Sequence, residues 1–212
     1  MIVYVPMPKS LFITFEGIEG SGKSVQVGLL GSKLRESGHD IVVTREPGGT
    51  RIGEEVRQIT HDPQNVDLTA VAEAYLMAAC RAQHVREIIK PSLDAGKIVL
   101  CDRFLDSSLA YQGYGRELGE ETILNLNQLA IDAVSPTLTI YLDVPVDVGL
   151  ERRKNDTKMD RLDLQQPDFY ERVRKGYLKL AKKNSARITI IDGAKSIEEV
   201  AKEIWTMVES LL

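Results

Sequence analysis

The chain has 212 residues, of which 43% are hydrophobic and 27% are charged, as in an ordinary globular domain. Its formal net charge of −4 provides no global basic field for nucleic acid, so a site for a phosphorylated ligand must be basic locally. We therefore expect a single α/β domain over residues 1–212 that has no nucleic-acid partner.

Short apolar runs alternate with longer amphipathic stretches along the chain. Near-continuous hydrophobic runs predict strands that are covered on both faces, as in a parallel sheet. These runs are Leu11–Glu16, Ile41–Arg45, Ile98–Asp102, Leu138–Asp143 and Ile188–Asp192. Apolar residues at helical spacing predict helices over Lys23–Ser37, Leu68–Lys90, Glu121–Ala133 and Ile197–Leu211. The alternation favours a doubly wound parallel sheet flanked by helices, with right-handed crossovers.

A glycine-rich stretch, FEGIEGSGKS, lies between the first predicted strand and the first predicted helix, and its spacing matches the P-loop pattern. In this context the glycines let backbone N–H groups converge on phosphate oxygens, and the helix start adds its positive dipole end. Lys23 is expected to reach the β- and γ-phosphates, and Ser24 to ligate Mg²⁺. The alternative, a plain glycine turn, is disfavoured by the strand-turn-helix context. The predicted nucleotide-binding residues are Gly17, Ile18, Glu19, Gly20, Ser21, Gly22, Lys23 and Ser24.

The next two predicted strands end in polar sequences that each contain an arginine. The second strand ends in TREPGGT, which contains Arg45, and the third in CDRFLDSSLAYQG, which contains Arg103. Ligands of open α/β sheets gather at the carboxyl ends of strands, and forked guanidinium donors suit phosphate. We therefore expect both arginines to converge on the P-loop crevice, with no neighbouring carboxylate that must pair with them. The alternative is a pair of local ion pairs, Arg45 with Glu46 and Arg103 with Asp102.

One segment, Glu151–Asp163, is nearly all polar and reads ERRKNDTKMDRLD. It is flanked by stretches that are typical of ordered elements. One interpretation is a solvated helix end followed by a loop. The other is a basic lid that closes over the nucleotide crevice.

The beginning of the chain and its cysteines indicate where the protein resides. The leader MIVYVPMPKS lacks a basic start, and no later stretch approaches the ~20 apolar residues of a membrane span. Cys80 and Cys101 lie in apolar surroundings without C-x-x-C spacing, so we expect reduced core thiols. These features predict a cytoplasmic protein with no membrane partner.

Several motifs in order along nearly the whole chain together resemble thymidylate kinase of the bacterial type. They are GIEGSGKS, REPGGT, DRFLDSSLAYQG, LDVPVDVGLERR and DRLD. The resemblance implies a P-loop nucleoside monophosphate kinase fold with a five-stranded parallel sheet and a mobile lid over residues of about 151–163. It also implies the reaction ATP + dTMP → ADP + dTDP in dTTP biosynthesis, with Mg²⁺ as cofactor and a homodimeric assembly.

The resemblance assigns the phosphate-binding residues as follows. Arg45 and Arg103 clamp the acceptor phosphate. Both lie within an acceptor-binding region of about 45–112, which also contains the base-binding residues. Glu19 contacts the 3′-hydroxyl side of the deoxyribose. Asp102 supports Mg²⁺ through water, and Arg152 packs along the adenine of ATP.

The resemblance also assigns the residues around the thymine base. Arg81 hydrogen-bonds a thymine carbonyl, Ser108 and Gln112 line the base, and Tyr111 lies beside C2′ of the sugar. Met77 stands where many members have a phenylalanine that stacks on thymine. Methionine is polarizable and adaptable, so a softer contact replaces the stacking; the alternative role for Met77 is a core filler. Tyr111 likewise has packing within the protein as its alternative role.

The lid departs from the family pattern. Gly20 follows the P-loop acid where another subtype has arginine, and members with glycine there use lid arginines instead. This lid contains Arg153, Lys154, Lys158 and Arg161, at a spacing that differs from the arginine-alternating pattern. Arg161 in DRLD matches best, and Arg161 and Arg153 are the candidate catalytic cations.

Phosphoryl transfer to a phosphate oxygen requires no general base, so His39, His61 and His84 are expected to be structural. Two other functions compete with this prediction. One is another kinase of the same fold that acts on a different monophosphate or on a nucleoside. The other is a nucleotide-binding protein without turnover.

Overall fold

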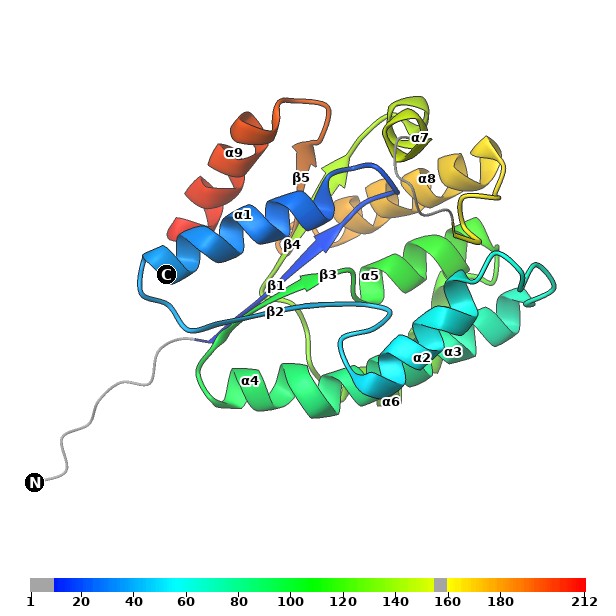
Figure 1. The fold of residues 1–212 in the computed structure, drawn as a ribbon, viewed down its shortest axis with the longest axis horizontal. Coiled ribbons are helices and arrows are strands. Elements are labelled where there is room, and N and C mark those ends of the chain that lie inside the picture. The colour runs from blue at the N-terminus through cyan, green and yellow to red at the C-terminus, as the bar shows by residue number, and fades with distance from the viewer. Residues whose placement is uncertain (1–9, 155–159) are drawn as a thin grey trace, which may run out of the picture.

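The computed structural model describes residues 10–154 and 160–212. Predictions for the first nine residues of the leader, and for residues 155–159 of the lid with Lys158 among them, lie outside the described residues. The described strands form a five-stranded parallel sheet in the order β2-β3-β1-β4-β5 (Figure 1). The strands are β1 Leu11–Glu16, β2 Ile41–Arg45, β3 Ile98–Asp102, β4 Leu138–Asp143 and β5 Ile188–Asp192. All five strand predictions are confirmed with their bounds.

Helices connect the strands and cover both faces of the sheet. They are α1 Lys23–Glu36, α2 Arg51–His61, α3 Ala70–His84, the π-helical turn η1 Val85–Ile89, α4 Lys90–Asp94, α5 Leu105–Ser108, the π-helical turn η2 Leu109–Gly115, α6 Glu120–Ile131, α7 Val146–Lys154, α8 Pro167–Lys183 and α9 Ile197–Glu209. Helices α1 and α9 lie on one side of the sheet, and the helices from α2 to α6 lie on the other (Figure 1). The predicted fold class is confirmed.

The helix predictions are correct in place and differ in extent. The predicted helix Leu68–Lys90 is a continuous helical path that changes from α to π geometry at Val85 and back at Lys90. Helix α6 ends at Ile131 because Asp132 and Ala133 adopt positive φ angles of 46° and 61°. Helix α2 was not predicted; the Thr50 hydroxyl begins it by accepting a hydrogen bond from the Gly53 N–H at 2.9 Å.

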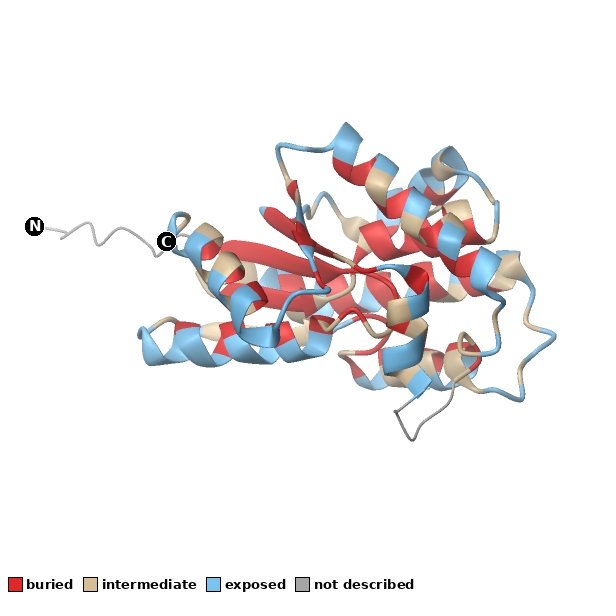
Figure 2. Cartoon of the chain, turned by 90° about the horizontal axis from the view of Figure 1, so that it is seen from above, coloured by how far each residue is buried: buried red, intermediate tan, exposed pale blue. Residues whose placement is uncertain are grey.

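The core divides along the sheet, whose three central strands β3, β1 and β4 are buried, whereas no residue of the edge strand β2 is fully buried (Figure 2). Leu11, Ile13 and Phe15 of β1 pack with α1 and α9 on one face, whereas Phe12 packs with η1 and Phe104 on the other. Alternate residues of one strand therefore anchor both helical layers, which holds the carboxyl end of β1 firmly. Among the described residues, no helix is long and apolar enough to cross a membrane.

The two cysteines have the environment that the sequence predicts. Cys80 and Cys101 are buried free thiols. Burial raises the pKa of both thiols, which favours the unreactive neutral form. Within residues 10–154 and 160–212, no group of three or more His, Cys, Asp or Glu side chains is placed to hold a metal ion by itself.

Candidate active site

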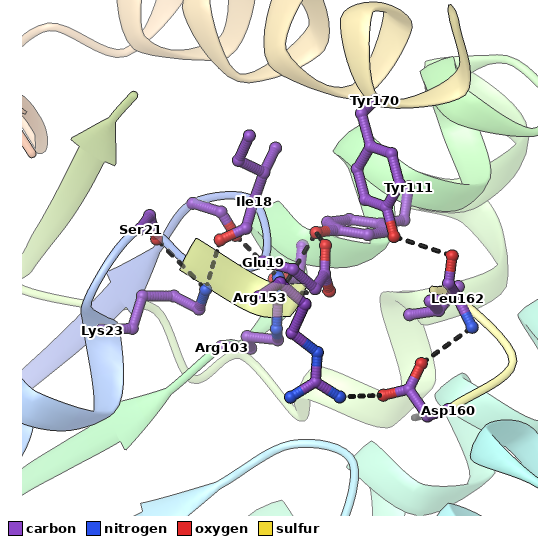
Figure 3. Close-up of polar contacts among 12 residues, drawn as sticks. Ile18, Glu19, Ser21, Lys23, Arg103, Tyr111, Arg153, Asp160, Leu162 and Tyr170 are labelled. Carbon is purple, nitrogen blue, oxygen red and sulfur yellow. Dashed lines mark hydrogen bonds and ion pairs between the residues drawn. The ribbon is translucent and has the colours of Figure 1, made fainter. Parts of the chain in front are cut away.

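The P-loop joins the carboxyl end of β1 to the first residue of α1. Gly20 and Gly22 have φ angles of 73° and 92°, and a Cβ on Gly20 would collide with the Gly149 carbonyl. The Lys23 ammonium donates to the Ile18 carbonyl at 2.8 Å and to Ser21 Oγ at 3.2 Å (Figure 3). The sequence therefore folds here into the strand–glycine turn–helix arrangement that a phosphate-binding loop requires.

Burial, reinforced by the positive charge of Arg103, lowers the pKa of Lys23 to about 8, although three nearby carboxylates act in the opposite direction. A bound phosphate stabilises the charged, protonated form of a lysine whose pKa is lowered in this way. The electrostatics of the loop therefore favour a negatively charged ligand.

Arg103 occupies a strained position directly after β3. Its φ of 72° is in the left-handed region, and two hydrogen bonds hold the turn: Arg103 N to Phe15 O at 2.9 Å and Phe104 N to Glu16 Oε1 at 2.8 Å. This backbone turns the guanidinium toward the P-loop, where it donates to Gly17 O at 3.0 Å. Non-glycine residues in such a conformation concentrate at functional sites, which fits a role for this arginine.

The Arg103 side chain joins the P-loop to the next helix. It donates to Glu19 Oε1 at 2.8 Å and to the Tyr111 hydroxyl at 3.2 Å. Tyr111 in turn donates to Glu19 Oε2 at 2.6 Å, which closes a partly buried triangle of three side chains. The predicted neighbourhood of Glu19, Arg103 and Tyr111 is therefore assembled in the structure.

Arg45 lies on the outer edge of the same crevice. Its guanidinium is half exposed and pairs with Glu54 of α2 at 3.0 Å. The expectation that neither arginine has a carboxylate partner is wrong, because Arg45 pairs with Glu54 and Arg103 pairs with Glu19.

The alternative local pairings, Arg45 with Glu46 and Arg103 with Asp102, are also wrong for these described residues. Glu46 is buried and pairs with Arg81 at 2.7 Å, and it accepts from His84 Nδ1 at 2.9 Å. Asp102 accepts a hydrogen bond from Ser24.

A cleft of about 430 Å³ lies between the P-loop and the ends of β2 and β3. Its cationic lining comes from the P-loop lysine and five arginines: Lys23, Arg45, Arg57, Arg103, Arg152 and Arg153. Glu19, Asp102 and Asp160 are its carboxylates besides the buried Glu46. This concentration of positive charge in a protein of net charge −4 gives the locally basic site that a polyphosphate ligand needs.

The cleft contains oxygen donors suited to Mg²⁺. Ser24 Oγ donates to Asp102 Oδ2 at 2.6 Å, which fixes a hydroxyl and a carboxylate side by side next to Lys23. Magnesium bound with a nucleotide keeps several waters and needs only one or two protein ligands. The two predicted metal residues therefore fit the ion chemically.

A narrower pocket, with about 30 Å³ of open space, adjoins the cleft on the other side of Arg103. Met77 and Glu73 of α3 line it, together with Tyr111 and Gln112 of η2 and the lid residue Arg161. The amide of Gln112 donates to Glu73 Oε1 at 2.7 Å. Met77 and Gln112, which the sequence predicts as base contacts, therefore lie in one pocket.

Two other predicted base contacts, Arg81 and Ser108, do not line this pocket and pack behind it. Arg81 is fully buried; its Nη1 donates to Ser108 Oγ at 3.0 Å and its Nη2 donates to Phe104 O at 3.0 Å. Glu46 and Asn127 are further partners of the same guanidinium. In this structure Arg81 ties α3 to the segment after β3.

The described part of the lid separates its two candidate arginines. Arg153 lines the larger cleft and pairs with Asp163 at 2.8 Å and with Asp160 at 3.5 Å; Figure 3 shows its guanidinium directed toward Asp160. Arg161 instead lines the narrow pocket, where its side chain donates to Thr60 O at 2.9 Å and pairs with Glu73.

Two further basic residues of this segment, Arg152 and Lys154, belong to its described part. Arg152 donates to the Gly193 carbonyl at 2.8 Å and to the Gly20 carbonyl at 3.5 Å, so it lies beside the P-loop. Lys154 pairs with Glu151 at the surface.

Sequence reasoning missed a buried carboxylate, Glu16, at the end of β1. It accepts from Phe104 N–H, Ser107 Oγ at 2.5 Å and the Tyr177 hydroxyl at 2.9 Å. Burial, reinforced by Asp106, raises the pKa of Glu16 to about 7. An acidic residue that ends an otherwise apolar strand directly before the P-loop glycine was the available signal.

His61 was expected to be structural, yet it lines both the cleft and the narrow pocket. Burial, together with the positive charge of neighbouring arginines, Arg57 first, lowers the pKa of His61 to about 3. The imidazole is therefore neutral at physiological pH. The position of His61 near a helix end in the sequence gave no indication that its side chain lines the cleft and the pocket.

Comparisons with known proteins agree with this geometry. The family model for thymidylate kinase matches residues 15–204. A thymidylate kinase from Geobacillus sp. (strain WCH70) is 50% identical over 194 residues, which cover 91% of this chain and 92% of the relative. One from Geotalea uraniireducens (strain Rf4) is 49% identical over 203 residues, covering 93% and 95%. The crystal structure of thymidylate kinase from Ehrlichia chaffeensis superposes with a TM-score of 0.78 at 40% identity, covering 95% of this chain and 99% of that chain. The chain belongs to the thymidylate kinase family.

Proposed function

We propose that this chain transfers the γ-phosphoryl group of ATP to dTMP, producing ADP and dTDP for dTTP synthesis. Family membership supports the activity. The observation that carries the residue assignment is the position of Arg103 between the polyphosphate cleft and the narrow pocket. A nucleotide in each would bring a donor and an acceptor phosphate together at this side chain.

The cleft is proposed to bind the phosphate groups of both nucleotides. Phosphoryl transfer needs alignment and charge stabilisation, because charge spreads over the equatorial oxygens of a loose transition state. We assign Lys23 to the donor phosphates and Arg45 with Arg103 to the acceptor phosphate. Arg153 supplies lid charge, supported by its place in the cleft, and Arg161 anchors the lid at the narrow pocket.

The P-loop is proposed to bind the phosphates of the donor nucleotide, and Arg152, which lies beside the P-loop, is proposed to pack along the adenine. Mg²⁺, when bound with ATP, neutralises part of the phosphate charge. Ser24 and Asp102 are the residues we propose to hold it, Asp102 through water. Their mutual hydrogen bond supports this assignment, because it places two oxygens at the phosphate end of the loop.

The acceptor nucleoside is proposed to occupy the narrow pocket, with Met77 and Gln112 against the base and Tyr111 against C2′ of the sugar. About 30 Å³ of open space holds only about one or two water molecules, so the side chains around the pocket must move apart to admit the nucleoside. Glu19 faces the deoxyribose. Arg81 and Ser108 support the base site from behind, since their side chains are buried and bonded to each other.

A coupled assay of ADP release with dTMP, dUMP, dCMP and dGMP tests this function. We expect dTMP to give the highest kcat/KM, and Lys23→Met to abolish turnover with every acceptor. A preference for another monophosphate would favour another kinase of the fold. Binding of ATP and dTMP without ADP release would favour a protein that lacks turnover; family membership favours neither.

We further propose that the chain acts as a homodimer in the cytoplasm; the two free thiols support this location. The outer faces of α3 and α6, which lie side by side, expose Val71 and Tyr75 on one helix and Leu124 and Leu129 on the other. Such an apolar surface suits a self-complementary contact. Sedimentation should give a dimer that Leu129→Glu converts to a monomer, and a monomeric parent protein would contradict the proposal.

A further inference from the structure

Glu73 in the first turn of α3 contacts residues from two distant parts of the chain, the region of η2 and the lid. Its carboxylate accepts from Gln112 Nε2 at 2.7 Å and from Arg116 Nη2 at 3.1 Å, and it pairs with Arg161. The side chain of Glu73 is only 3% exposed. It therefore lies at the junction of the narrow pocket, the end of η2 and the lid.

The contact with Glu73 determines how the Gln112 amide is turned. An ionised carboxylate can only accept hydrogen bonds, so the amide must present its NH₂ group to Glu73. Gln112 Oε1 then faces away; it is buried and has no hydrogen-bond partner among the described residues. Gln112 itself lines the pocket and is 4% exposed. A buried acceptor without a partner is unfavourable, which indicates that a ligand N–H completes it.

The charge of Glu73 is secured by its neighbours. Burial of this carboxyl group favours its neutral form, but the charge of Arg116 and the hydrogen bonds from Arg161 and Gln112 outweigh burial. They hold the pKa of Glu73 below its usual value. Glu73 is therefore an anion at neutral pH and has no proton to donate to Gln112.

We propose that Glu73 is a positioning residue for base selection: it turns the Gln112 amide so that Oε1 accepts the N3–H of a thymine or uracil base. Cytosine has an unprotonated N3, which is itself an acceptor, so it would face Oε1 without a hydrogen bond. The pocket thus selects against cytosine through a residue that acts on the base by way of Gln112. This inference rests on the proposed function, because it requires the base of dTMP to occupy the narrow pocket.

The test compares kcat/KM for dTMP and dCMP in the parent enzyme, Glu73→Gln, Gln112→Leu and the double variant. A glutamine at position 73 can donate or accept, so it no longer dictates the orientation of the Gln112 amide. We expect each single variant to lower the dTMP/dCMP ratio by about ten-fold, the scale of one hydrogen bond to a buried group. In the Gln112→Leu background, Glu73→Gln should cause no further change in the ratio, because Glu73 acts through Gln112.

Glu120→Gln is the matched control, since Glu120 pairs with Lys183 and Tyr114 outside the pocket; its ratio should equal that of the parent. If Glu73→Gln does not fold, Glu73→Asp keeps the charge for the arginines, withdraws the carboxylate from Gln112, and should lower the ratio as well. An unchanged ratio in an active, folded Glu73 variant would overturn the inference. Equal additive losses in the double variant would overturn it too. A parent enzyme that does not phosphorylate dTMP would instead overturn the proposed function.

Discussion

The polyphosphate cleft and the narrow pocket differ in their size and in the side chains that line them. The cleft of about 430 Å³ is lined by glycine backbone and by cations such as Arg45, whose side chain is 54% exposed. The pocket of about 30 Å³ is lined by buried side chains that are already bonded to each other, such as Gln112 and Glu73. Charge in an open cleft binds any phosphate, whereas a fixed network discriminates between bases.

Arg103 belongs to both regions, so its loss should have the largest effect. We expect Arg103→Ala to lower kcat/KM for dTMP by at least ~100-fold while ATP binding barely changes. Steady-state kinetics with an ATP titration measure both. Arg45→Ala should cost less, about ten-fold, because Arg45 is half exposed and already paired with Glu54. Unaltered dTMP kinetics in both variants would contradict the assignment of the two arginines to the acceptor phosphate.

The lid arginines provide the next test, because they line different regions. Arg153→Ala should lower kcat by about ten-fold or more with little change in KM, because Arg153 lines the cleft and is proposed to act on the reacting phosphates there. Arg161→Ala should raise KM for dTMP more than it lowers kcat, because Arg161 lines the narrow pocket in which the acceptor is proposed to bind. Initial-rate measurements distinguish the two, and the reverse pattern would exchange the roles of the two arginines.

A smaller effect is expected for sugar selection by Tyr111. Its ring is buried against Phe169 and Tyr177, and its hydroxyl is bonded to Glu19, so it cannot easily move away from a ribose 2′-hydroxyl. A hydroxyl buried there without a partner costs about 1–3 kcal/mol. Tyr111→Ala should therefore narrow the kcat/KM gap between dTMP and its ribose counterpart by about ten-fold.

Tyr111→Phe, which keeps the ring, should preserve that gap. A gap that persists in a folded Tyr111→Ala protein would show that other residues select the sugar.

The smallest effect is a proton taken up when ATP binds. The pKa of Lys23, about 8 in the free site, lies below its ordinary value. Phosphate binding favours the charged lysine, so at pH 8 binding should take up about half a proton, and at pH 6.5 almost none, because Lys23 is then already charged. Calorimetry in two buffers of different ionisation enthalpy measures this uptake. Lys23→Met should abolish it, and an uptake that is absent at pH 8 in the parent protein would contradict the assignment.

The sheet was predictable because buried parallel strands are continuous apolar runs, as in Leu138–Asp143. Helices α2 and α8 were not predicted, although their sequences carry the signal. Buried residues recur at helical spacing in α8, as Phe169, Val173 and Leu180 do, so this periodicity was available and was missed. The change to π geometry at Val85 within a predicted continuous helix leaves no such periodic signal in the sequence.

The two regions differ in how far the sequence reveals them. The cleft can be recognised from contiguous sequence motifs, because one loop supplies most of a phosphate-binding site. The pocket network joins Glu73, Arg116 and Arg161, which lie far apart in the chain and have no fixed spacing. The partners of Arg45 and Arg103 were missed for the same reason: Glu54 lies on an unpredicted helix, and Glu19 precedes Arg103 by 84 residues.

The central claim is that phosphate binding and base recognition are separate functions of adjoining regions. The most direct measurement is the ratio of kcat/KM for dTMP to that for dUMP in Arg45→Ala, since Arg45 lines only the cleft of the two. The account predicts that both values fall by the same factor, so that the ratio stays within about two-fold of the parent ratio. A ratio that shifts by about ten-fold would show that the cleft takes part in base selection and would contradict the separation.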